Sequence, residues 1–353
     1  MGLFDEMLKD NESLFLNEVA LDPEFMPKQI AFREQENQVI ALRIRPLFQK
    51  RTGSNLLIYG PPGIGKTVAV KKVVEELQET TDQIIPLYIN CWQHNSTYKV
   101  VLELCNQLEY RRTVNKLTAE LSDAVVALLN KSSAVLVFDE VDRSLDLDYL
   151  YLLSEKVYRK TIILISNYSD TLSNVDERIR SRLSPELLEF CPYTLEETKS
   201  ILEQRKNYGF VAGVWENAAF ERIVQACFNL KDIRKGLYLL REAGNGAEAE
   251  ASRKIALKHA EQAVAKLGQT PSKKDILDDE SKLIISLLAE EEKIGSLFER
   301  YQREGGTSSY KTFQRKIEKL ARDGHIVTKK VLGGPEGTTT LVSRASEKQT
   351  RLN

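Results

Sequence analysis

The sequence predicts an α/β domain built on a parallel sheet, followed by an all-helical domain and by a small domain of helices and two strands. Three observations predict this class. Short apolar runs alternate with helical patterns as far as Phe190, only helical patterns follow, and Gly268–Lys274, which lacks apolar periodicity, precedes a third unit. We expect an N-terminal extension and the α/β domain over residues 1–189, the helical domain over 190–268 and the third domain over 275–353.

The parallel sheet is predicted from runs that are apolar on both faces. Residues 84–90, 134–140 and 161–167 have the sequences IIPLYIN, AVLVFDE and TIILISN, and NLLIY at 55–59 is a shorter run of the same kind. Strands buried on both faces are typical of parallel sheets, whose strands are joined by right-handed crossovers. Helical patterns precede and separate these runs at 33–48, 68–77, 98–108, 119–129 and 147–157.

The rest of the chain follows two further patterns. Helices are expected at 195–205, 217–228, 232–242 and 251–267, with a glycine-containing break at 244–252. After Lys274 come three short helical patterns and then two strand-like runs around Gly333–Gly337. The second and third domains are therefore expected to be separate units.

Composition excludes several classes of protein. The 353 residues include 50 Lys+Arg and 51 Asp+Glu, and 42% are hydrophobic, so neither global disorder nor a basic field over the whole chain is expected. No apolar run is long enough to span a membrane, and the acidic Met1–Asp10 does not resemble a signal peptide, which favours a cytoplasmic protein without membrane contact. The scattered Cys91, Cys105, Cys191 and Cys227 favour buried thiols over disulfides or a zinc site.

The clearest chemical signal is a phosphate-binding loop. It matches G-x-x-x-x-G-K-[ST], follows an expected strand and opens an expected helix. Its glycines let backbone N–H groups approach phosphate oxygens, Lys66 supplies a positive charge to them, and Thr67 can ligate Mg²⁺. The nucleotide-binding residues are Gly60, Pro61, Pro62, Gly63, Ile64, Gly65, Lys66, Thr67 and the next residue of the helix, Val68.

Polar residues at the ends of two later strands complete the predicted site. Asp139 is expected to hold Mg²⁺ with Thr67, and Glu140 to polarise the attacking water, since ligands bind at the carboxyl ends of parallel strands. The alternative is an ordinary strand end followed by a helix cap. Asn167 ends the next strand, where its amide reaches the γ-phosphate or orients the water; otherwise it is a turn residue.

An arginine cluster follows at Arg178, Arg180 and Arg182. Such a cluster is ordinarily a solvated helix face, but an arginine can also act on the γ-phosphate of a neighbouring subunit. The chain resembles an AAA+ ATPase in the order and spacing of four features: the phosphate loop, VLVFDE, ILISN and this arginine cluster. Further segments resemble the archaeal-type origin recognition proteins, the replication initiators related to the cell-division-cycle helicase-loading factor: FREQE at 32–36, INC at 89–91, SPE at 184–186, FCPY at 190–193 and DIRK at 232–235.

The resemblance implies roles for individual residues. Arg182 is the arginine finger and Arg178 an auxiliary contact, both acting in a homo- or hetero-oligomer. Arg234, which otherwise is a helix-surface arginine, is the second sensor of bound nucleotide, and Arg33 and Tyr193 border the adenine pocket. The implied ligands are ATP or ADP with Mg²⁺, and the implied partners are double-stranded origin DNA and the replicative helicase. The expected location is the nucleoid.

The C-terminal pattern of a helix, a basic helix and a β-hairpin is the order of a winged helix. Phe313, Ile317 and Leu320 recur at helical spacing and face a core. Candidate DNA contacts are Lys311, Arg315, Lys316 and Lys319 on the helix, with Lys329 and Lys330 in the following strand. Amphipathic basic helices and winged helices also bind proteins, and the wing tip Gly333–Gly337 lacks Lys and Arg.

Further alternatives stay open at this stage. The resemblance implies a helical, DNA-contacting insertion near Glu109–Leu117, with Arg111 and Arg112, although the same residues fit a solvated helix end. The protein could also be a long-lived ADP-bound platform that recruits a helicase. A clamp-loader subunit or a transposition-type ATPase is a further alternative within the AAA+ class.

Overall fold

The computed structural model describes residues 13–27, 31–173, 175–269, 279–288, 292–322, 325–334 and 337–344. Within these ranges the side chains of residues 269, 279, 319, 322, 330–334 and 337–339 are not described. The chain divides into two compact units, Met1–Leu267 and Gly268–Asn353. Among the described residues, no helix combines the length and apolar character needed to cross a membrane.

The first unit contains a parallel sheet in the order β2-β3-β4-β1-β5. The four predicted strands are confirmed as β1 Leu56–Tyr59, β2 Ile84–Asn90, β3 Ser133–Asp139 and β4 Lys160–Ile165. Every residue of β3 and β4 is buried, as expected for strands covered on both faces. The fifth strand, β5 Glu186–Glu189, was missed because this short edge strand carries exposed glutamates and no continuous apolar run.

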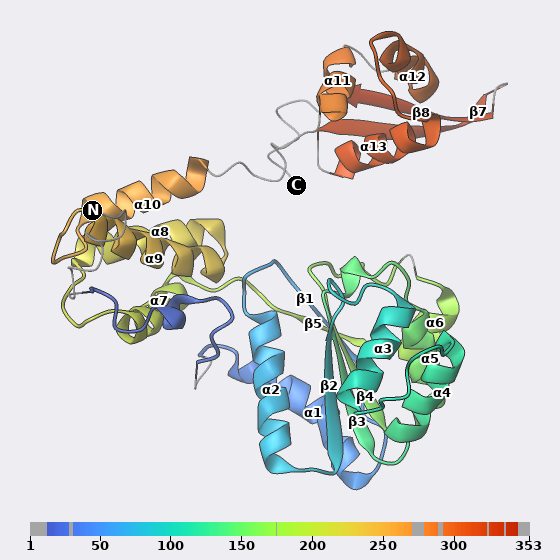
Figure 1. The fold of residues 1–353 in the computed structure, drawn as a ribbon, viewed down its shortest axis with the longest axis horizontal. Coiled ribbons are helices and arrows are strands. Elements are labelled where there is room, and N and C mark those ends of the chain that lie inside the picture. Colours follow the sequence, from blue (N-terminus) through green and yellow to red (C-terminus); the bar gives the residue numbers. More distant parts are fainter. Residues whose placement is uncertain are drawn as a thin grey trace. The chain divides into compact units, whose positions relative to one another are not determined.

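Helices cover both faces of this sheet (Figure 1). One layer contains α1 Glu34–Ile44, η2 Arg45–Gln49 and α2 Lys66–Thr80, and it packs on Val135, Val137, Ile163 and Ile165. The opposite layer contains α3 Thr97–Gln107, α4 Thr118–Leu129, α5 Asp148–Lys156 and α6 Glu177–Leu183, and it packs on Leu136, Phe138, Ile162 and Leu164. The expected α/β fold is therefore confirmed. The single helix expected over 33–48 is an α-helix followed by a 3-10 turn, in which Pro46 cannot donate the next helical hydrogen bond.

A helical lid completes the first unit. It consists of α7 Leu195–Gly209, α8 Asn217–Leu230, α9 Ile233–Ala249 and α10 Leu257–Gln269. The N-terminal segment packs here and not on the sheet: Leu21 belongs to the lid core, and the ring centroids of Phe15 and Phe210 lie 4.7 Å apart. Its assignment to the α/β domain as part of 1–189 therefore differs from the structure, because its apolar side chains are buried by the lid.

The break expected at 244–252 is also different in the structure, since α9 continues to Ala249. A Cβ built on Gly244 would lie 2.4 Å from Phe15 Cζ and 2.7 Å from Phe210 Cε1. This glycine therefore permits close packing of two aromatic rings and does not end the helix.

The second unit has a winged-helix arrangement. Its elements are α11 Asp279–Leu287, β6 Glu292–Lys293, α12 Ile294–Arg303, α13 Tyr310–Arg322, β7 Ile326–Gly334 and β8 Gly337–Arg344. The strands form an antiparallel sheet in the order β6-β8-β7. Phe313, Ile317 and Leu320 of α13 are buried in its core, as their spacing predicted.

Candidate functional site

A cavity of about 390 Å³ lies at the carboxyl ends of the central strands, between the phosphate loop and the lid. The residues predicted for the site that line it are Pro62, Gly63, Gly65, Lys66, Thr67, Val68, Asp139, Glu140, Asn167, Tyr193 and Arg234. Gly60 and Pro61 line a neighbouring surface depression with Pro62 and Asn167. The fold thus brings together residues from the loop, two strand ends and the lid, which are far apart in sequence, at the edge of the sheet where ligands bind.

The phosphate loop depends on glycine conformation. Gly63 and Gly65 have φ of 77° and 89°, a backbone region that residues other than glycine rarely adopt. The Lys66 ammonium, on a residue that is 7% exposed, donates to the carbonyl oxygens of Gly60 at 2.6 Å and Pro61 at 2.8 Å. Burial lowers the pKa of Lys66 to about 8. The loop therefore holds a desolvated positive charge beside the backbone amides that open α2.

Oxygen ligands meet beside the loop. The Thr67 hydroxyl donates to Asp139 Oδ2 at 2.7 Å, so the two predicted magnesium ligands are in direct contact. The Tyr88 hydroxyl donates to the same oxygen at 2.6 Å. Tyr88 was not predicted, because a tyrosine inside an apolar strand carries no signal of its own. Its placement near Asp139 depends on the pairing of β2 with β3.

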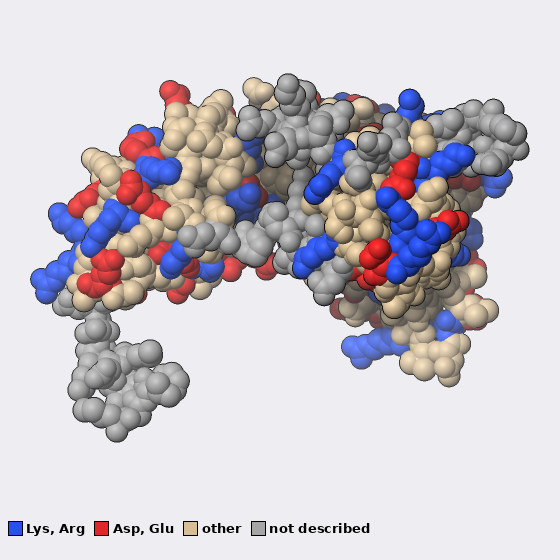
Figure 2. All heavy atoms as spheres, turned by 90° about the horizontal axis from the view of Figure 1, so that it is seen from above, with Lys and Arg blue, Asp and Glu red and all other residues tan. Residues whose placement is uncertain are grey.

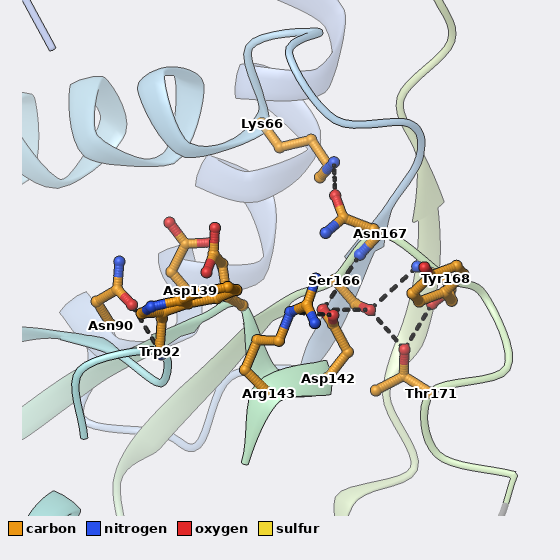
Figure 3. A network of polar contacts seen from close by, with 11 residues as sticks. Lys66, Asn90, Trp92, Asp139, Asp142, Arg143, Ser166, Asn167, Tyr168 and Thr171 are labelled. Carbon is orange, nitrogen blue, oxygen red and sulfur yellow. Dashed lines mark hydrogen bonds and ion pairs between the residues drawn. The ribbon is translucent and has the colours of Figure 1, made fainter. Parts of the chain in front are cut away.

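Glu140 and Asn167 border the same cavity from adjacent strand ends. Glu140 has a left-handed backbone with φ of 54°, and its N–H donates to Asp139 Oδ1 at 2.8 Å. Burial, together with the charges of Asp139 and Asp142, raises the pKa of Glu140. Asn167 Oδ1 accepts a hydrogen bond from Lys66 Nζ at 3.0 Å (Figure 3). This contact joins the end of β4 to the phosphate loop.

The lid contacts the phosphate loop through the start of α9. Asp232 caps this helix by accepting the N–H of Arg234 at 3.0 Å, and the N–H of Ile233 donates to the Gly63 carbonyl at 3.1 Å. The Arg234 guanidinium pairs with Asp232 at 3.2 Å and lines the cavity. Arg234 is therefore placed at the site and not on a remote helix surface.

Of the predicted adenine pair, Tyr193 lines the cavity and Arg33 does not. Arg33 is 4% exposed, and its guanidinium donates to the carbonyls of Ile64 at 3.0 Å and Cys191 at 2.7 Å. It also donates to Glu36 and to the Tyr193 hydroxyl. These partners satisfy the buried charge of Arg33 and explain its position beside the phosphate loop.

The structure adds a lid residue and an N-terminal wall to the cavity. Arg205 of α7 lines it and donates to the carbonyls of Ala20 at 3.0 Å and Phe25 at 2.9 Å. Pro23, Glu24, Met26 and Pro27 line the cavity beside it. An arginine within an amphipathic helix has no local sequence signal for this role, so only the packing of the N-terminal segment on the lid shows it.

Arg178 and Arg182 do not line the cavity. Both lie exposed on α6, where Arg182 pairs with Glu155 at 3.0 Å and lies over the ring of Tyr151, 5.1 Å from its centroid. They are therefore positioned on the surface of the α/β domain and not at the nucleotide cavity of their own chain.

Only some of the residues predicted to contact DNA are exposed in the structure. Lys311 and Arg315 of α13 and Lys329 of β7 are exposed, whereas Lys316 pairs with Glu280 of α11 at 2.5 Å. The side chains of Lys319 and Lys330 lie outside those described. Figure 2 shows basic and acidic side chains interspersed over the face in view, in keeping with a net charge of −1. Any basic surface is therefore local.

Residues 109–117, for which a helical insertion and a solvated helix end were both open, form an irregular loop that follows the end of α3. Arg111 and Arg112 are exposed in it, and so are Val114, which is 82% exposed, and Leu117. Left-handed backbone at Glu109 and Asn115 interrupts any continuous helix.

Comparison with known proteins gives the family. A model of the AAA domain matches residues 49–173, and a model of the Cdc6 AAA+ ATPase-type lid domain matches residues 199–265. The chain is 32% identical to the ORC1-type DNA replication protein of Pyrococcus abyssi over 76% of this chain and 68% of that protein. It is 29% identical to ORC1-type DNA replication protein 2 of Methanothermobacter thermautotrophicus over 89% and 88% of the two chains.

The fold agrees with this assignment. The Aeropyrum pernix ORC1 protein, solved in complex with DNA, superimposes with a TM-score of 0.72 and 24% identity over 96% of each chain. The predicted resemblance to archaeal-type origin recognition proteins is confirmed by the curated relatives and by the Cdc6-type lid model. With a matched AAA domain, a Cdc6-type lid and relatives that span most of its length, the chain belongs to the family of ORC1-type DNA replication proteins, which are AAA+ ATPases.

Proposed function

We propose that this protein is an ATP-dependent replication initiator that binds duplex origin DNA and helps to recruit the replicative helicase. One observation carries the proposal. The chain combines a nucleotide cavity, which the lid borders, with a separate winged-helix unit whose α13 exposes Lys311 and Arg315. The A. pernix relative of the same fold was solved with DNA. Basic side chains on such a helix contact phosphates and fix its register in the groove.

The cavity suits ATP or ADP with Mg²⁺. The backbone amides of the loop and Lys66 bind the phosphates, while Tyr193, Arg205 and the N-terminal wall surround the remaining volume. Thr67 Oγ1 and Asp139 Oδ2, 2.7 Å apart, are oxygen ligands of the kind Mg²⁺ prefers beside nucleotide phosphates. The donor set therefore fits this ion, which supplies charge neutralisation to the phosphates when bound.

The other residues divide the work of hydrolysis. Glu140 orients and deprotonates the attacking water, for which a raised pKa is suitable. Asn167, held at Lys66, reaches the γ-phosphate, and Arg234 contacts nucleotide from the lid. Two states of the lid, set by the nucleotide, then control how the protein engages DNA.

Arg182 completes the site of a neighbouring subunit, with Arg178 beside it. Its exposed position on α6, away from its own cavity, supports action in trans. An arginine supplied to phosphoryl transfer accelerates the reaction by roughly a thousandfold or more, so hydrolysis by an isolated subunit is slow.

Mixing two inactive variants tests this arrangement. Glu140→Gln removes the water-activating carboxylate and Arg182→Ala removes the finger, so each variant alone binds ATP but turns it over slowly. Mixed together, they assemble sites that combine an intact Glu140 with a partner's Arg182, and turnover rises above that of either variant. Arg180→Ala, which alters an exposed arginine of the same helix paired with Glu177, serves as the control with wild-type turnover. No gain on mixing contradicts the trans arrangement, and full turnover by Glu140→Gln removes Glu140 from its role.

A further inference from the structure

A carboxylate whose hydrogen bonds have no role yet in the proposed site lies between the two strand ends that carry Glu140 and Asn167. Asp142 follows β3 and its side chain is 9% exposed. Its Oδ1 accepts a hydrogen bond from the Ser166 hydroxyl at 3.1 Å and a longer one from the backbone N–H of Asn167 at 3.4 Å (Figure 3). The carboxylate therefore joins the segment after β3 directly to the end of β4.

The turn after β4 is organised around the Ser166 hydroxyl. Ser166 is 1% exposed, contacts Thr171 Oγ1 at 2.5 Å and accepts the N–H of Tyr168 at 3.1 Å. Thr171 in turn donates to the Tyr168 carbonyl at 2.8 Å. These bonds fix the backbone on both sides of Asn167, and Asp142 connects this turn to the neighbouring strand end.

The Asp142 carboxylate also lies close to Arg143, which packs on an aromatic ring just after β2. Arg143 Nε lies 3.4 Å from Asp142 Oδ2, and the Arg143 guanidinium lies over the Trp92 ring, 4.8 Å from its centroid. The N–H of Trp92 donates to Asn90 Oδ1 at 2.8 Å. Figure 3 shows these groups gathered around the strand ends, with Asp142 reaching Lys66 through Asn167.

We propose that Asp142 is a positioning residue for the amide of Asn167. By accepting from Ser166 and from the Asn167 backbone, it fixes the turn that presents Asn167 Oδ1 to Lys66 and to the γ-phosphate. Hydrogen bonds to an ionised acceptor are stronger than neutral ones, and reacting groups lose efficiency when displaced by even about 1 Å. The inference rests on the proposed function, since it concerns the same hydrolytic site.

Single-turnover ATP hydrolysis in two backgrounds tests this role. Asp142→Ala lowers the hydrolysis rate about tenfold in otherwise wild-type protein, because Asn167 loses its orientation. It leaves ADP affinity within about twofold of wild type, since ADP lacks the γ-phosphate that Asn167 addresses. In an Asn167→Ala background the same substitution lowers the rate much less, because the group it positions is gone and only the charge that Asp142 places near Glu140 is lost. Asp142→Asn, which keeps the shape of the side chain, gives an intermediate rate and guards against a folding defect.

Asp146→Ala is the matched control. Asp146 lies in the same connection but accepts from the backbone and hydroxyl of Thr97, and its hydrogen bonds do not involve the β4 end. Asp146→Ala is expected to change the hydrolysis rate by the same factor in the wild-type and the Asn167→Ala backgrounds. If Asp142→Ala also gives equal losses in both backgrounds, or weakens ADP binding in parallel with hydrolysis, the inference is overturned. Wild-type protein without hydrolysis, or Asn167→Ala with wild-type hydrolysis, contradicts the proposed function instead.

Discussion

The guanidinium of Arg33 lies over the ring of Tyr193, 4.1 Å from its centroid, and its Nε donates to the hydroxyl of the same residue at 3.1 Å. That hydroxyl lies 2.7 Å from the position of a Cβ built on Gly65. A residue near the start of α1 thus holds an aromatic wall of the cavity against the phosphate loop.

Arg33→Lys is expected to weaken ADP binding about tenfold. A lysine cannot reproduce the planar set of donors that reaches Tyr193, Ile64 and Cys191, so buried carbonyls lose partners, at about 1–3 kcal/mol each. Titration with a fluorescent ADP analogue measures the change. Arg43→Lys is the control, because Arg43 pairs with Glu186 and does not line the cavity. Unchanged affinity in Arg33→Lys contradicts the positioning role.

Lys66 predicts a pH dependence of nucleotide binding. Burial holds its pKa at about 8 in the free protein, whereas bound phosphates favour the charged form and raise it. ADP affinity is therefore nearly constant below pH 8 and falls by up to about tenfold per unit above it, as binding must take up a proton. Affinities measured from about pH 7 to 9.5 check this. Lys66→Arg, whose guanidinium does not titrate there, binds with a flat profile; equal slopes for both proteins refute the assignment.

Alanine substitutions at two glycines of α9 are expected to have opposite effects on the stability of the lid. Gly244→Ala places a methyl group against Phe15 and Phe210 and destabilises the lid by about 1–3 kcal/mol. Gly246→Ala meets only Gln262 Oε1, at 3.9 Å, and stabilises the helix by about 0.5–1 kcal/mol. Urea unfolding followed by Trp215 fluorescence in a Trp92→Phe background measures both. Destabilisation of equal size in the two variants contradicts the packing described here.

The sheet and the phosphate site could be predicted from sequence because their signals are local. Each buried strand is a continuous apolar run, and Asp139 and Asn167 each stand at the end of one, where parallel strands meet, while Lys66 belongs to a loop with a recognisable spacing of glycines. The family resemblance added Arg234 and Tyr193, which the structure places at the cavity.

The remaining features depend on contacts between distant segments. Arg33 and Arg205 have no periodic signal, and only their carbonyl partners on other segments explain their positions. Lys316 was predicted as a DNA contact because it lies beside the helically spaced Lys311 and Arg315, but Glu280, on a different helix, pairs with its charge. Gly244 is a helix breaker by propensity, and the approach of Phe15 explains why it stands inside α9.

Binding to duplex DNA is the property on which the proposed initiator function depends. Fluorescence anisotropy across a salt series compares wild type with Arg315→Ala, from α13, and with Arg303→Ala, which removes an exposed arginine of α12 in the same domain. Wild type is expected to bind in a salt-sensitive manner. Arg315→Ala should bind more weakly, with a salt slope shallower by about one, and Arg303→Ala should behave as wild type. Wild-type protein that ignores duplex DNA at moderate salt, or equal losses in both variants, would contradict the initiator function proposed here.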